Sequence, residues 1–145
     1  MALDFEASYI VWALIALTGY TIFTPLAQVA TQQVPSTVVA LVANSVLATS
    51  ALVVVLYTTG GEIGRYLTGN ALLYMIGAGL FLTVGILAYY RALSTGPISV
   101  VTPIYGMFLV GSSIIGIVAL GEPLSIRKAT GIALAVVAIY LTATG

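Results

Sequence analysis

The sequence contains no cysteine and no histidine, and few of its side chains carry charge. Without cysteine the chain cannot form disulfides or thiolate metal sites, and without histidine it lacks the commonest general base and metal ligand. Lys and Arg together number 4, as do Asp and Glu, so no basic face indicates binding to nucleic acid. We therefore expect no enzyme activity, no metal site, no cofactor and no nucleic-acid partner.

Apolar side chains dominate instead and make up 61% of the 145 residues. They form five runs separated by short polar segments, at about 9–30, 34–57, 71–93, 97–120 and 124–144. A helix needs ~20 apolar residues to cross a bilayer core, and each run reaches that length. A membrane β-barrel would instead show alternating segments of ~10 residues. The sequence predicts an all-α membrane protein with five transmembrane helices in a single domain, residues 1–145.

The positions of lysine and arginine predict the orientation of these helices. Asp4 and Glu6 precede the first run where a signal peptide would have basic residues, so we expect this run to be retained as a helix. The loops at 58–70 and 121–128 carry three of the basic residues, and Arg91 alone lies on the opposite side. Basic residues favour the cytoplasmic side. We expect a multi-pass protein of the plasma membrane with its N-terminus in the cytoplasm.

Two of the predicted helices contain an internal proline. Pro25 and Pro103 each remove one backbone hydrogen bond and permit the helix to bend. Around Pro103, polar and small side chains recur every three or four residues. They are Thr102, Tyr105, Leu109, Ser112 and Gly116. A bent helix with this pattern suits an interior wall that moves or admits a solute, although tight packing would also explain its glycines.

Polar residues in the other helices have two interpretations each. Four in the first helix share one face and indicate either hydrogen bonds between helices or the wall of a water-lined pathway. They are Thr21, Thr24, Gln28 and Thr31. An amide faces lipid only at a high cost, so Asn44 either bonds a neighbouring helix or contacts a solute. Tyr89 and Tyr90 either belong to an interfacial aromatic belt or line the mouth of a cavity.

Residues 90–104 read Tyr-Arg-Ala-Leu-Ser-Thr-Gly-Pro-Ile-Ser-Val-Val-Thr-Pro-Ile, and Gly121-Glu122 follows further along the chain. This combination resembles the EamA domain of the drug/metabolite transporter superfamily. There, a similar stretch joins the third and fourth helices, and a Gly-Glu pair closes the fourth. The strongest match runs from residue 89 onward, and the first two helices agree with the family in length and spacing.

The resemblance implies a fold and a mode of action. Most family members have ten helices, arranged as two inverted five-helix repeats around a central cavity, and they move metabolites by alternating access. The five helices of this chain correspond to one half of that inverted-repeat fold. We therefore expect a homodimer in the lipid bilayer, with protomers inserted in opposite orientations. The alternative is pairing with a different half encoded elsewhere.

Charged residues are absent from the middle of every predicted helix. A carboxylate inside the membrane is the usual mark of proton coupling, so its absence predicts facilitated diffusion or exchange of a small neutral or zwitterionic metabolite. The expected contacts with this small-molecule substrate are Tyr20, Asn44, Tyr89, Tyr90, Thr102, Tyr105 and Ser112. Two other functions stay open: an accessory or structural membrane bundle, and a subunit of a lipid-carrier flippase, which also occurs in the superfamily.

Overall fold

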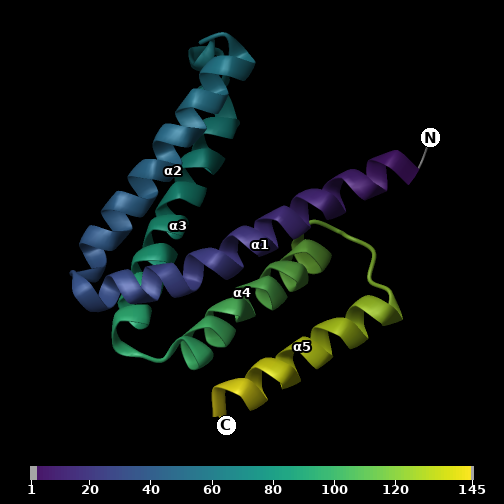
Figure 1. The fold of residues 1–145 in the computed structure, drawn as a ribbon. Coiled ribbons are helices and arrows are strands. Elements are labelled where there is room, and N and C mark those ends of the chain that lie inside the picture. Colours follow the sequence, from purple (N-terminus) through teal and green to yellow (C-terminus); the bar gives the residue numbers. More distant parts are fainter. Residues whose placement is uncertain (1–2, 145) are drawn as a thin grey trace. The chain divides into compact units, whose positions relative to one another are not determined.

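The computed structural model describes the backbone of residues 3–144 and the side chains of residues 9–144, and all regular secondary structure in this part of the chain is helical (Figure 1). Five α-helices and one short 3-10 helix follow one another. They are α1 (Leu3–Gln33), α2 (Ser36–Thr59), η1 (Ile63–Tyr66), α3 (Gly69–Thr95), α4 (Ile98–Ala119) and α5 (Ile126–Thr144). The predicted all-α fold with five long helices is confirmed. The short helix η1 lies within residues 58–70, which were expected to form a loop.

Each α-helix is long and apolar enough to cross a membrane, with a mean hydropathy between 1.5 and 2.3. The shortest, α5, has 19 residues. At 1.5 Å per residue its length is about 28 Å, close to the thickness of the hydrocarbon core. No more than 11% of the most apolar window of any helix is buried within the chain. The chain is therefore a multi-pass membrane protein whose exposed apolar faces need lipid or another protein around them.

Glycine and proline set several helix boundaries. Gly60 follows α2 with φ 60°, a left-handed conformation that glycine adopts at little cost, and this glycine ends the helix. Pro35 and Pro97 directly precede α2 and α4, as N-caps with ψ of 136° and 141°. This extended backbone lets each proline carbonyl accept hydrogen bonds from the first helical turn.

The helices divide into two compact units. One contains the residues up to Pro25 together with Thr95 and the residues that follow it. The other is Leu26–Ser94, which holds the end of α1, α2, η1 and nearly all of α3. The boundary inside α1 falls at Pro25, where the helical hydrogen bond to the Thr21 carbonyl cannot form. A missing backbone hydrogen bond thus coincides with a boundary between units.

In the first unit, α4 and α5 pack against each other (Figure 1). They run in opposite directions and are joined by the segment 120–125. The buried residues of α4 are Val110 and Gly116. Most of the α5 surface stays exposed, including Leu134 and Tyr140 at 63% and 66%.

In the second unit, burial is concentrated at one end of its helices. The buried residues lie where α1 ends, α2 begins and α3 ends: Ala27, Thr31, Ser36, Ala40, Tyr89, Tyr90 and Leu93. At the opposite end of α2, Tyr57 is 91% exposed. The turn between α1 and α2 and the last turns of α3 therefore form the best-packed part of this unit.

Candidate functional site

Helix α4 contains the only buried side-chain oxygen or nitrogen that lacks a hydrogen-bond partner in the described part of the chain, Thr102 Oγ1. Burying a hydroxyl without a partner costs free energy, so such a group needs a reason. Thr102 directly precedes Pro103, which cannot donate to the Ser99 carbonyl. Unpaired polar groups in this turn could hydrogen-bond a solute.

Two further candidates on α4 lie toward its C-terminus from Thr102. Tyr105 is half-buried, three residues along on the same face, and its ring centroid lies 5.1 Å from that of Phe108. Ser112 is exposed within the chain. Tyr20 of α1 belongs to the same unit. It is 57% exposed and packs edge-to-face with Phe23 at 5.9 Å.

The other three candidates lie in the second unit. Tyr89 and Tyr90 are 3% and 1% exposed, which agrees with an interior position and not with a belt facing lipid headgroups. The Asn44 amide nitrogen donates to the Ala40 carbonyl at 2.8 Å, within its own helix rather than to a neighbour. The candidates therefore fall into two groups, one in each unit.

The polar face of α1 was expected to bond other helices or to line water. Its threonines donate to carbonyls of α1 itself: Thr21 to Leu17, Thr24 to Tyr20 and Thr31 to Gln28, at 2.8–2.9 Å. Such bonds satisfy hydroxyl donors in an apolar setting. Sequence spacing cannot distinguish them from bonds between helices.

The second unit also has a cavity of about 310 Å³ that sequence reasoning missed. Residues 31–36 line it together with Arg91 and Ser94 of α3. Its walls come from segments about sixty residues apart, so no local pattern predicts it. The only hints in the sequence are the adjacent Gln32 and Gln33 beside a predicted turn, and an isolated arginine.

The comparison with protein families decides what kind of molecule this is. A profile of the EamA-like transporter family matches residues 7–144. The chain belongs to the EamA-like transporter family. The match covers all five membrane helices, so it extends the resemblance from residue 89 onward to α1 and α2. Neither a search of curated proteins nor a search of solved structures gave a match.

In this EamA-like chain, the Gly-Glu pair follows the end of α4. The Leu120 N–H donates to the Ile115 carbonyl at 3.3 Å, and the Glu122 N–H donates to the Gly116 carbonyl at 3.1 Å. Both bonds are wider than the four-residue step of an α-helix. Gly121 between them has φ 72°, so the chain reverses here through a left-handed glycine.

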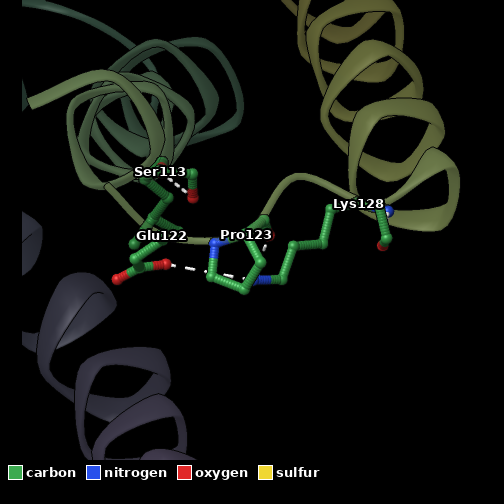
Figure 2. A network of polar contacts seen from close by, with 6 residues as sticks. Ser113, Glu122, Pro123 and Lys128 are labelled. Carbon is green, nitrogen blue, oxygen red and sulfur yellow. Dashed lines mark hydrogen bonds and ion pairs between the residues drawn. The ribbon is translucent and has the colours of Figure 1, made fainter. Parts of the chain in front are cut away.

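The Glu122 side chain folds back over α4 (Figure 2). A Cβ atom added at Gly116 would lie only 3.2 Å from Glu122 Oε1, so the carboxylate rests where a larger residue would project. Lys128 of α5 also contacts this turn. Its Nζ lies 3.9 Å from Glu122 Oε2 and donates to the Pro123 carbonyl at 3.1 Å. The pair thus links the two helices of the first unit.

Proposed function

We propose that this chain transports a small neutral or zwitterionic metabolite by alternating access, as a homodimer of oppositely inserted protomers in the plasma membrane. Membership of the EamA-like family makes it a membrane transporter of the drug/metabolite type. The observation that carries the substrate class is the uncharged polar character of α4. Its buried Thr102 hydroxyl has no partner among the described residues, and no ionisable acid or base lies near it in the helix.

In this proposal the hydroxyl and aromatic side chains of α4 contact the solute. Thr102 and Tyr105 are one helical turn apart and offer donors, acceptors and an aromatic face. Ser112 lies further along the helix. Neutral polar groups of a metabolite would replace the hydrogen bond that Thr102 lacks, whereas a polycation would find no carboxylate there.

Internal prolines supply the flexibility that alternating access requires. Pro25 lies inside α1 and Pro103 inside α4, and each leaves one carbonyl without its helical donor. A helix bends at such a position more readily than elsewhere. Small changes at these bends would open the pathway to one side of the membrane and then to the other.

The proposed dimer supplies a second set of five helices. Inverted-repeat transporters bind their substrates near the bilayer midplane, where two repeats meet. A second copy, inserted in the opposite orientation, provides the inverted repeat that the family resemblance implies. The small difference in basic residues between the two sides of the helices is compatible with both orientations.

The test is solute flux into proteoliposomes that contain the purified chain, with a panel of labelled amino acids. We expect uptake down the solute gradient, with no requirement for a proton gradient. Tyr105→Ala and Ser112→Ala should lower uptake roughly tenfold while the dimer persists in size-exclusion chromatography, because lost hydrogen bonds and ring contacts weaken solute binding. Thr83→Ala is the matched control, since the Thr83 hydroxyl is exposed and already donates to the Gly79 carbonyl.

Two results would contradict the proposal. Flux that strictly required a proton gradient would show coupling that an uncharged pathway cannot supply. If Tyr105→Ala and Ser112→Ala lower uptake only because the dimer comes apart, the result would favour an accessory bundle.

A further inference from the structure

We propose that the turn between α1 and α2, with the last turn of α3, forms a binding site for an oxyanion, either a carboxylate or a phosphate group. The site is the cavity of about 310 Å³ lined by residues 31–36, Arg91 and Ser94. All of these residues belong to the second unit. The proposal does not depend on which solute the protein transports.

The charge of the cavity favours an anion. Arg91 is permanently protonated and presents several N–H donors in a planar fork that matches carboxylate and phosphate oxygens. None of the residues that line the cavity is an aspartate or a glutamate. The guanidinium is therefore the only formal charge of the lining.

Two hydroxyl groups of the lining already donate hydrogen bonds to backbone carbonyls. Thr31 donates to the Gln28 carbonyl at 2.8 Å, and Ser94 donates to the Arg91 carbonyl at 2.7 Å. The remaining side-chain donors are the amides of Gln32 and Gln33 and the hydroxyl of Ser36. Ser36 is only 9% exposed and belongs to the lining of the cavity. Its hydroxyl is therefore a donor at the cavity wall.

The first turn of α2 adds backbone donors. The Pro35 carbonyl accepts from Val38 and Val39, at 2.9 and 3.2 Å. The N–H groups of Ser36 and Thr37 precede any helical acceptor, and the helix dipole places partial positive charge at this end. Ser36, with its backbone N–H and its hydroxyl, and Arg91, with its guanidinium, both line this cavity, and the N–H of Thr37 belongs to the next residue of the same turn.

The position of the cavity indicates where such an anion would come from. It lies where one membrane-spanning helix ends and the next begins, so we expect it near the boundary of the hydrocarbon core. Both lipid phosphates and the carboxylates of dissolved solutes are present at that depth. The shared chemistry is the oxyanion, and the experiment separates the two sources.

The experiment uses the full chain in maltoside micelles, a detergent without oxyanions. Sodium phosphate is titrated at constant ionic strength while the amide and arginine Nε–H signals are recorded by ¹⁵N NMR. In parallel, native mass spectrometry records retention of phosphatidylglycerol against phosphatidylcholine. We expect saturable shifts at residues 33–37 and Arg91, preferential retention of phosphatidylglycerol, or both.

Variants locate the binding. Arg91→Gln should weaken binding of the responding probe by roughly tenfold, as expected for the loss of a charge-assisted contact. Arg65→Gln is the control: Arg65 lies in the same unit, and its guanidinium pairs with Glu62 at 4.0 Å on an exposed surface. It should change binding less than twofold. Ser36→Ala should weaken binding of the same probe less than Arg91→Gln does. It tests the site if the Arg91→Gln protein does not fold.

Each outcome decides the proposal. Saturable phosphate shifts that Arg91→Gln weakens support a site for free oxyanions. Phosphatidylglycerol retention alone, lost in Arg91→Gln, supports a lipid phosphate. If neither probe binds the unmodified chain saturably, or if Arg91→Gln and Arg65→Gln behave alike, there is no oxyanion site in this cavity.

Discussion

Hydroxyl groups in this chain are mostly paired within their own helices. The Thr18, Thr83 and Ser113 side chains all donate to the carbonyl four residues earlier, at 2.8–2.9 Å. Such bonds let threonine and serine face an apolar surrounding at little cost. Thr102 differs, because its oxygen is buried and has no partner in the described structure.

Thr102→Val tests this difference. Valine keeps the branched shape but removes the hydroxyl. The variant therefore avoids the free-energy cost of taking an unpaired hydroxyl out of water on folding. We expect the variant to be more stable than the unmodified protein by about 1–3 kcal/mol, the usual cost of a buried unpaired polar group. Thermal unfolding in detergent measures the stability, and proteoliposome flux should fall in the same variant.

Thr83→Val serves as the control for that comparison. Its hydroxyl is exposed and already bonded to the Gly79 carbonyl, so its loss should change stability by less than about 0.5 kcal/mol. If Thr102→Val unfolds at a lower temperature than Thr83→Val, the Thr102 hydroxyl has a partner, and its proposed role is wrong.

The tyrosines show how far single residues could be predicted. The sequence placed Tyr89 and Tyr90 near the end of a membrane helix but left two surroundings open. Their burial at 3% and 1% differs from that of belt residues facing lipid headgroups, and the mouth of a cavity stays a prediction for them. No periodicity within α3 could decide this, because adjacent residues point in directions about 100° apart and yet both are buried.

Helix ends are predictable where backbone conformation alone sets them. Gly60 ends α2, because its φ of 60° is unfavourable for other residues. The structure at the end of α4 depends on side-chain contacts as well as on Gly121. Glu122 returns over Gly116, and Lys128 from α5 lies beside it. This arrangement depends on contacts between two helices, which the sequence pattern does not contain.

Gly116→Ala tests the packing at the end of α4. In an exposed helix, replacing glycine by alanine stabilises by about 1 kcal/mol. At position 116 the new Cβ would lie 3.2 Å from Glu122 Oε1 and displace the carboxylate, which should cancel most of that gain. Gly111→Ala in the same helix, where a Cβ meets nothing within 4 Å, should show the full gain in thermal unfolding.

A double variant separates packing from helix propensity. Adding Glu122→Ala to Gly116→Ala removes the crowded carboxylate, so the gain should reappear when compared with Glu122→Ala alone. Equal stabilisation by Gly111→Ala and Gly116→Ala would mean that the Glu122 side chain is not held over α4. The ion pair with Lys128 contributes little to this comparison, because both of its side chains are about half exposed.

For the molecule as a whole, the dominant feature is a large apolar surface that lipid or protein must cover. Side chains such as Phe81 and Val118 are 83% and 79% exposed within the chain. Lipid can cover such faces, and so can a second copy. The proposed antiparallel dimer therefore leads to a prediction about the orientation of each protomer.

Single-cysteine variants can measure that orientation, because the natural sequence has no cysteine to interfere. Gln33→Cys lies at the end of α1, just before α2 begins, and Thr68→Cys lies between η1 and α3, after α2 has ended. If protomers insert both ways, an impermeant maleimide added outside cells should label about half of each variant. Labelling of only one of the two variants would show a single orientation, and the dual-topology dimer would be wrong.

Composition and length alone established the class of this protein and the number of its membrane helices. Helices of about twenty apolar residues are the simplest way for a chain to cross lipid with every backbone hydrogen bond made internally, and this rule acts locally. Function at the level of the family followed from short motifs. The cavity at the α1–α2 turn, the burial of Tyr89 and Tyr90, and the return of Glu122 over Gly116 were visible only in the folded chain. Each of these depends on how separate segments pack, and the energies that select such packing come from contacts that neither hydropathy nor spacing records.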